Sequence, residues 1–192
     1  MSNLSRDLEY REQQGNPITV AVVGAGQMGR GLVAALGSIR GMRPAVGIDA
    51  ELERAEQALI QAGVNPGQID RSDDADKTFR LMTHGQYVIG QQAAIIPASG
   101  VDAVVEATGV PEVGARVALD AIHRRQHIIM LNVETDVTIG RVLNQLARQS
   151  AVVYSVSAGD EPGATVELVE FARTLGFTVI AAGKGKNNTL DP

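Results

Sequence analysis

A glycine-rich turn near the N-terminus is the part of the sequence with the clearest chemistry. Gly24, Gly26 and Gly29 fill the glycine positions of a G-x-G-x-x-G motif, and Gln27 and Met28 stand between the last two. An apolar run precedes the motif and a helical pattern follows it, which is the context in which this motif binds a dinucleotide. The first glycine permits a tight turn, the second lets backbone approach a pyrophosphate, and the third lets helix and sheet pack closely. We predict that the turn binds the phosphates of a dinucleotide at the helix N-terminus; a plain strand-to-helix turn is the alternative.

A carboxylate follows the next predicted strand, about 20 residues after the last glycine. Asp49 stands at this position, where an acidic residue accepts hydrogen bonds from the ribose hydroxyls of NAD. It would repel the 2′-phosphate of NADP unless a cation such as Arg43 or Arg54 offset the charge. We therefore predict NAD or NADP as the cofactor, with NAD slightly favoured. A role of Asp49 as the N-cap of the next helix is compatible with ribose binding.

The segment "EATGVPE", residues 106–112, follows a later strand. Thr108 and Gly109 leave that strand, while Pro111 and Glu112 suit the first turn of a helix. One interpretation places Thr108 and Gly109 against the nicotinamide ribose. Simple helix capping explains the same residues equally well.

Polar residues also end the strand in "IIMLNVETD", residues 128–136. Asn132 is the first of them, and we expect it to point toward the nicotinamide end of the cofactor. Glu134 and Asp136 are close enough for acid–base work, but a helix start is the favoured interpretation. In the later segment "SAGDEPGA", residues 157–164, helix caps are again favoured over a cation site with oxygen ligands.

Two lysines near the C-terminus could bind an anion. Lys184 and Lys186 stand in "AAGKGKNN", flanked by glycines, and such a turn can bring ammonium and backbone N–H groups to a carboxylate or phosphate. A solvated tail is the alternative. We predict Lys184, Lys186 and Asn132 as the catalytic, substrate-holding residues and no metal ligands. The sequence contains no G-x-S-x-G or H-E-x-x-H motif that would indicate a hydrolase or metalloprotease.

Strand and helix patterns alternate along most of the chain and would position these residues. Buried-strand patterns stand at 18–24, 44–49, 86–90, 101–109, 127–132, 151–157 and 177–183. Helical patterns stand at 4–14, 28–39, 50–63, 91–99, 111–125, 136–149 and 161–176. Residues 64–85 are polar and show no clear pattern. The alternation predicts an α/β fold, a doubly wound parallel sheet of the Rossmann type with its ligand at the carboxyl ends of the strands.

Composition excludes several classes of function. The chain has 192 residues, a formal net charge of −5 and no cysteine. Nucleic-acid binding would need a clustered basic face, and a membrane span would need about 18 consecutive apolar residues. The charged N-terminus lacks the apolar core of a signal peptide. We expect a cytoplasmic protein that acts on a small-molecule substrate.

Five segments together resemble the nucleotide-binding domain of homoserine dehydrogenase-like oxidoreductases. They are "VAVVGAGQMGRGL", "VDAVVEATGVPEVGARVALDAI", "IIMLNVETDV", "VVYSVSAGDEPGATVELVEFARTLGF" and "IAAGKGKNN". The branch that the chain resembles often carries a C-terminal SAF domain and includes enzymes similar to 1-deoxy-D-xylulose 5-phosphate reductoisomerase. The resemblance implies a helical segment over 1–16 and an NAD(P)-binding domain over 17–192. It also implies that the family's substrate and dimerisation domain is absent from these residues, and it leaves a homo-oligomer open.

Two departures from homoserine dehydrogenases bear on the substrate. Those enzymes place a lysine directly after the asparagine, where this chain has Val133, and a Gly-Thr-Thr-Asn stretch where this chain has Lys184 to Asn188. The resemblance therefore implies hydride transfer between nicotinamide and a small polar or phosphorylated substrate other than homoserine. A non-catalytic, dinucleotide-sensing module is the alternative function. FAD or S-adenosylmethionine on the same fold is a weaker one.

Overall fold

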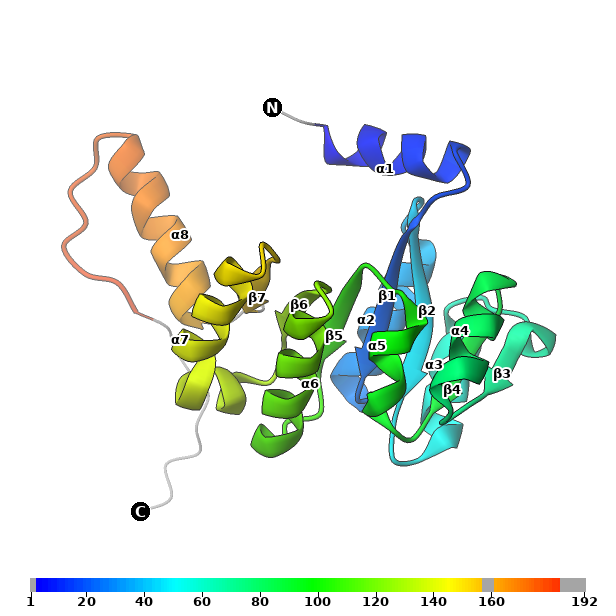
Figure 1. The fold of residues 1–192 in the computed structure, drawn as a ribbon. Coiled ribbons are helices and arrows are strands. Elements are labelled where there is room, and N and C mark those ends of the chain that lie inside the picture. The colour runs from blue at the N-terminus through cyan, green and yellow to red at the C-terminus, as the bar shows by residue number, and fades with distance from the viewer. Residues whose placement is uncertain (1–2, 157–160, 184–192) are drawn as a thin grey trace, which may run out of the picture. The chain divides into compact units, whose positions relative to one another are not determined.

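Seven parallel strands form one sheet in the first part of the chain (Figure 1). The computed structural model describes residues 3–156 and 161–183. The strands are β1 (Ile18–Val23), β2 (Met42–Ile48), β3 (Ile69–Arg71), β4 (Tyr87–Gly90), β5 (Ala103–Glu106), β6 (His127–Met130) and β7 (Tyr154–Val156). Their order across the sheet is β3-β4-β2-β1-β5-β6-β7. Every neighbouring pair is parallel.

The order in which the chain adds strands to the sheet reverses at β1. The chain first builds β2, β3 and β4 on one side of β1, then crosses over to add β5, β6 and β7 on the other. β1 pairs with β2 and with β5, so the carboxyl ends of β1 and β5 lie side by side at the reversal. This is the place where doubly wound sheets bind their ligands. The predicted fold class, a doubly wound parallel sheet, is confirmed.

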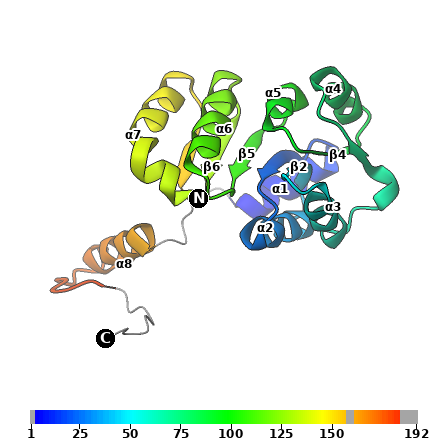
Figure 2. The ribbon, with the colours of Figure 1, turned by 90° about the horizontal axis from the view of Figure 1, so that it is seen from below.

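Helices cover both faces of this sheet. In the first part of the chain they are α1 (Leu4–Gln13), α2 (Gln27–Ser38), α3 (Leu52–Gln61), η1 (Pro66–Gln68), α4 (Ala75–Thr83), η2 (Ala93–Ile95), α5 (Ile96–Ser99), α6 (Pro111–His123) and α7 (Val133–Gln149). Figure 2 shows α2 and α3 on one face and α4, α5, α6 and α7 on the other. The described helices include none that is both long and apolar enough to cross a membrane.

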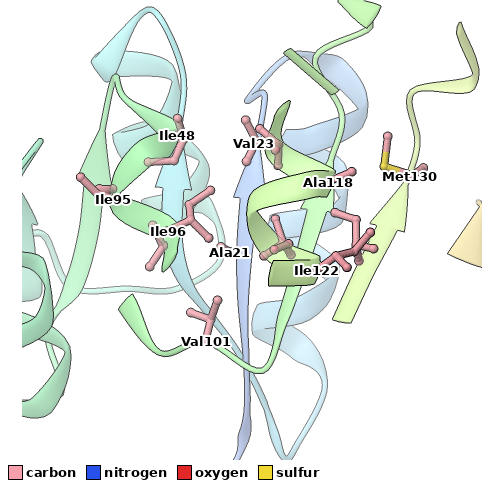
Figure 3. Packing of buried hydrophobic residues seen from close by; sticks show 14 of the residues in the cluster. Ala21, Val23, Ile48, Ile95, Ile96, Val101, Ala118, Ile122 and Met130 are labelled. Atoms are coloured by element: carbon pink, nitrogen blue, oxygen red, sulfur yellow. The ribbon is translucent and has the colours of Figure 1, made fainter. Parts of the chain in front are cut away.

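Two apolar clusters hold the layers together. Ala21 and Val23 of β1 face the cluster under α5, α6 and α7, where Ile122 and Met130 are also buried (Figure 3). The alternate residues of β1 point into the opposite cluster, under α2 and α3. Because successive side chains of a strand point to opposite faces, a strand covered on both sides must be apolar throughout. This requirement explains the unbroken apolar run over residues 20–23, the buried part of β1.

The unpatterned segment 64–85 contains three regular elements, η1, β3 and α4. Strand β3 has only three residues and forms an edge of the sheet, which is too short to show a periodic pattern. Helix α4 begins at a cap, since the backbone N–H of Lys77 donates to Asp74 Oδ1 at 2.7 Å. Asp74 in "SDDAD" was a recognisable cap signal that the sequence reading missed.

The chain separates into two compact units, Met1–Val156 and Ser157–Pro192. In the second unit, α8 (Glu161–Thr174) ends as predicted near a glycine. The N–H of Gly176, which has a φ of +85°, donates to Arg173 O, and the N–H of Phe177 donates to Ala172 O. This pair of bonds is a Schellman motif. The domain assignment, 1–16 and 17–192, stays a prediction.

The strand predicted at 177–183 was wrong. These residues have no strand conformation, and the side chain of Ile180 is 95% exposed. A β-branched sequence forms a strand only where a neighbouring strand accepts its backbone hydrogen bonds, and no described strand pairs with this segment.

Candidate functional site

A cavity of about 570 Å³ opens at the reversal point of the sheet. Its floor consists of the ends of three strands, Val23 of β1, Ile48 of β2 and Ala107 just after β5. Four of the predicted cofactor-binding residues line it, namely Gly24, Gly26, Asp49 and Thr108. The fold thus brings together three loops that are far apart in the sequence.

The three motif glycines have different surroundings. A Cβ on Gly24, whose φ is +95°, would lie 2.8 Å from the carbonyl carbon of Ala107 and 2.9 Å from the nitrogen of Thr108. A Cβ on Gly29 would collide with the carbonyl oxygen of Gly24. By contrast, a Cβ on Gly26 would meet nothing within 4 Å. Gly24 and Gly29 are therefore required by packing, while Gly26 leaves open space beside the cavity.

The N-terminus of α2 adjoins this space without a side-chain cap. Gly26 is the N-cap residue, no side chain bonds to the first turn, and that turn contains no acidic residue. Gln27 and Met28 are exposed there and do not line the cavity. Since the first N–H groups of a helix lack intrahelical partners, this terminus can accept an anion.

Asp49 joins the end of β2 to the glycine turn. Its Oδ2 accepts a hydrogen bond from the N–H of Ala25 at 2.7 Å, and its Oδ1 accepts one from the N–H of Glu51 at 2.9 Å. A carboxylate has about four lone-pair sites, so both oxygens can still accept hydrogen bonds from a ligand. The half-buried Asp49 is thus held in place at the cavity wall.

Only one of the two arginines considered beside Asp49 lines the cavity. Arg54 does so, and it forms an exposed ion pair with Glu51 at 2.7 Å. Arg43 instead lies near the amino end of β2, where its guanidinium stacks on Tyr87 at 4.2 Å from the ring centre and bonds to the carbonyl of Gln86.

Sequence reasoning missed one wall of the cavity, formed by Gln91 and Gln92 after β4. Asp73 Oδ1 accepts hydrogen bonds from the N–H groups of Gln91 and Gln92 at 2.7 and 2.8 Å. The side chain of Gln91 donates to the carbonyl of Ala50 at 2.6 Å. These contacts join the three loops that follow β2, β3 and β4, and no local motif in the sequence indicates them.

Thr108 forms the third wall through a tight loop. Its N–H donates to Glu106 Oε1 at 3.0 Å, its hydroxyl donates to the same oxygen, and the hydroxyl accepts the N–H of Val110 at 3.2 Å. Gly109 follows with a φ of +69°, a conformation that favours glycine. Gly109 is exposed beside the cavity without lining it.

Asn132 lies behind this loop, only 1% exposed. Its Oδ1 accepts the N–H of Thr135 at 3.1 Å, which makes it the N-cap of α7. Its Nδ2 donates to the carbonyl of Val110 at 3.1 Å. Because of this cap, α7 begins at Val133 rather than at the predicted residue 136.

The two carboxylates that follow Asn132 belong to the first turn of α7, as the favoured interpretation held. Glu134 is exposed. Asp136 accepts a hydrogen bond from the Tyr154 hydroxyl at 2.6 Å. Burial, and then the neighbouring Asp136 carboxylate, raises the pKa of the Tyr154 hydroxyl above its ordinary value.

The two predicted lysines, Lys184 and Lys186, lie outside the described residues, and so do residues 157–160 of the segment "SAGDEPGA". Within 3–156 and 161–183, no group of three or more acidic or histidine side chains has the arrangement of a metal site.

A family model described as "Oxidoreductase DRL, catalytic domain" matches residues 159–192. No curated protein sequence matches the chain significantly. Solved structures match the chain at low sequence identity. An oxidoreductase from Agrobacterium radiobacter, in complex with NAD+, L-tartaric acid and magnesium, is similar with a TM-score of 0.60 and 14% identity, over 83% of this chain and 40% of that one.

Two further structures give the same result. Scyllo-inositol dehydrogenase from Lactobacillus casei, with bound NAD(H) and scyllo-inositol, has a TM-score of 0.54 and 14% identity, over 82% of this chain and 42% of that one. A homoserine dehydrogenase from Thiobacillus denitrificans has a TM-score of 0.54 and 19% identity, over 74% of this chain and 30% of that one. This chain therefore spans less than half the length of the structures it matches.

These similarities show the fold alone, which is an α/β doubly wound sheet of the Rossmann type. The closer resemblance to homoserine dehydrogenases and the SAF-domain branch rests on the sequence segments alone.

Proposed function

We propose that residues 3–156 are the cofactor-binding part of an NAD(P)-dependent oxidoreductase. The observation that carries the proposal is that Gly24, Gly26, Asp49 and Thr108 line one cavity at the reversal point of the sheet. Sheets of this kind bind dinucleotides across that point, one nucleotide on each side.

Each part of the cavity suits one part of the cofactor. The uncapped N-terminus of α2 suits the pyrophosphate, and Asp49 at the end of β2 suits the ribose of the adenosine half. The nicotinamide half then falls on the other side of β1, beside Thr108 and Gly109. When bound, the cofactor supplies the hydride chemistry, and the protein binds and orients it.

We propose that NAD is slightly favoured over NADP. Both oxygens of Asp49 can accept hydrogen bonds from the two ribose hydroxyls, whereas a 2′-phosphate would face the carboxylate. Arg116, on α6, also lines the cavity. Arg54 is the lining arginine next in sequence to Asp49, and Glu51 already pairs with it at 2.7 Å. Its charge is therefore partly offset by a neighbouring acid.

The substrate proposed is a small polar or phosphorylated molecule. Lys184 and Lys186 lie within the segment that matches the oxidoreductase catalytic-domain model, which supports their proposed role in binding an anionic group. Asn132 is proposed to act by holding Val110, since both ends of its amide are bonded within the protein. Val133 in place of a lysine supports a substrate other than homoserine.

Cofactor binding is tested by titrating the protein with NADH and NADPH while nicotinamide fluorescence and melting temperature are followed. NADH should enhance the fluorescence and raise the melting temperature, and NADPH should bind more weakly. A protein that responds to neither dinucleotide would disprove the proposal.

A matched pair of variants locates the site. The Cβ of Gly26→Val would meet nothing within 4 Å, so the fold should persist while the side chain blocks the pyrophosphate. The control, Gly31→Ala, lies on the same helix and also meets nothing within 4 Å. We expect Gly26→Val to lose at least about tenfold in NADH affinity, because backbone must approach the pyrophosphate closely at this glycine, and Gly31→Ala to lose none.

A further inference from the structure

Glu106 is a buried carboxyl group that none of the roles above explains. It is the last residue of β5, a strand between β1 and β6, and its side chain is 0% exposed. A carboxyl group in the core costs free energy unless it has hydrogen-bond partners, and an apolar side chain would fill the same space. The partners of Glu106 should therefore indicate why an acid stands there.

One oxygen of Glu106 organises the loop at the cavity wall. Oε1 accepts the N–H of Thr108 at 3.0 Å and also the Thr108 hydroxyl, which in turn accepts the N–H of Val110 at 3.2 Å. A single carboxyl oxygen thus holds the N–H and the hydroxyl of Thr108 and, through that hydroxyl, the N–H of Val110. Thr108 lines the cavity, whereas Glu106 does not.

The carbonyl groups of the same loop are held from the other side. Asn132 Nδ2 donates to the Val110 carbonyl at 3.1 Å, and the Thr135 hydroxyl donates to the Pro111 carbonyl at 3.2 Å. The loop therefore has its N–H groups bonded toward β5 and its carbonyls bonded toward the start of α7.

These polar groups meet at one point against α6. A Cβ on Gly114 would lie 3.0 Å from Glu106 Oε2 and 2.7 Å from Asn132 Nδ2, and it would collide with the Thr135 hydroxyl. Oε2 itself is buried and has no hydrogen-bond partner among the described residues. The fold thus contains a buried, unsatisfied carboxyl oxygen, which costs free energy. An apolar side chain would avoid this cost, so stability alone does not account for Glu106.

We infer that Glu106 is a positioning residue, which holds Thr108 to Val110 in the shape that receives the nicotinamide half of the cofactor. The inference rests on the proposed function, since it needs a dinucleotide in the cavity. It assigns Glu106 an effect on one half of the ligand only. The adenosine half is received by the glycine turn and Asp49, which make no hydrogen bond to Glu106.

The test compares Glu106→Ala with Glu106→Gln, and NADH with ADP. ADP carries the adenosine and pyrophosphate but lacks the nicotinamide half. Losing two hydrogen bonds to a carboxyl oxygen should weaken NADH binding by about 10-fold or more, while ADP affinity stays within about twofold. The amide oxygen of Glu106→Gln can accept the same two bonds, so this variant should keep NADH affinity within about threefold.

The chain offers a control at the amino end of the same strand, whereas Glu106 stands at its carboxyl end. Asp102, just before β5, also accepts a threonine N–H and hydroxyl, those of Thr19, at 2.7 and 2.8 Å. Asp102→Ala removes the same pair of hydrogen bonds from an exposed carboxylate, at the amino end of β5 and away from the cavity. It should change the melting temperature without changing NADH affinity.

A double-mutant cycle checks that Glu106 acts through Thr108. Thr108→Val in the Glu106→Ala background should cause little further loss of NADH affinity, because the hydroxyl contact is already absent. The inference is overturned if Glu106→Ala keeps its NADH affinity, or if it loses ADP and NADH affinity equally. Failure of the unmodified protein to bind either ligand would instead reject the proposed function itself.

Discussion

The two sides of the cavity are built in different ways. On the β2 side, the glycine turn presents uncapped backbone N–H groups, and Asp49 is half-buried at the wall. On the β5 side, the wall is a loop held by buried side chains, Glu106 and Asn132, which are 0% and 1% exposed. The β2 side is thus shaped by backbone N–H groups and by glycines. The β5 side is shaped by buried hydrogen bonds.

This difference determines what each side can tolerate. Where a wall depends on the absence of a side chain, adding one is harmful. Where a wall depends on buried hydrogen bonds, removing one partner leaves the other unsatisfied, and this penalty exceeds the value of an exposed bond. Substitutions on the two sides should therefore differ in kind and in size.

The largest effect on stability is expected for Asn132→Ala on the β5 side. The change removes the cap of α7 and leaves the Val110 carbonyl without its donor. We expect a loss of about 2–4 kcal/mol in the free energy of unfolding, measured in urea. Asp74→Ala removes an exposed cap of α4 and should lose only about 1 kcal/mol. Equal losses would contradict the distinction between buried and exposed partners.

On the β2 side, Gly29→Ala should cost about 1–3 kcal/mol by overpacking. Its Cβ would collide with the Gly24 carbonyl, so α2 must move away from β1. Gly31→Ala, whose Cβ meets nothing within 4 Å, should instead stabilise the helix by about 0.5–1 kcal/mol. Thermal or urea unfolding of both variants measures the difference, and a destabilised Gly31→Ala would refute the steric explanation.

Asp49→Asn should change the choice of cofactor more than stability. The amide has one acceptor oxygen in place of two, and it no longer repels a 2′-phosphate. NADH affinity should fall about tenfold, or about 1.4 kcal/mol, while NADPH affinity rises relative to it. Glu53→Gln, on the exposed surface of α3 outside the cavity, serves as the control. If the ratio of NADH to NADPH affinity stayed unchanged, Asp49 would have no part in selecting the cofactor.

The smallest effect concerns Tyr154, next to the β5 side. Because its folded-state pKa is raised above the ordinary value, its contribution to stability is present below about pH 10 and is lost as the pH rises further. The free energy of unfolding of the unmodified protein, relative to Tyr154→Phe, should therefore decline above about pH 10. Phenolate absorbance should also show one tyrosine ionising late. Parallel stability curves would argue against the pKa shift.

The sequence allowed the elements with strong local signals to be predicted. Asp49 and the glycine turn fall where the strand–turn–helix pattern places them, and they line the cavity together. Strand β3 was not predicted, because three residues are too few to show the alternation of apolar and polar side chains. The strand at 177–183 was predicted from β-branched residues alone, although a strand also needs a paired neighbour.

The sequence by itself determined the alternation of strands and helices, and with it the doubly wound sheet, because apolar periodicity and glycine turns are local properties. It also identified Gly24, Gly26, Asp49 and Thr108 as residues at the strand ends. Only the tertiary structure decided what stands behind them. Hydrogen bonds such as those of Asn132 with Val110 join residues 22 positions apart in the chain, and such contacts exist only once the strands have taken their order in the sheet.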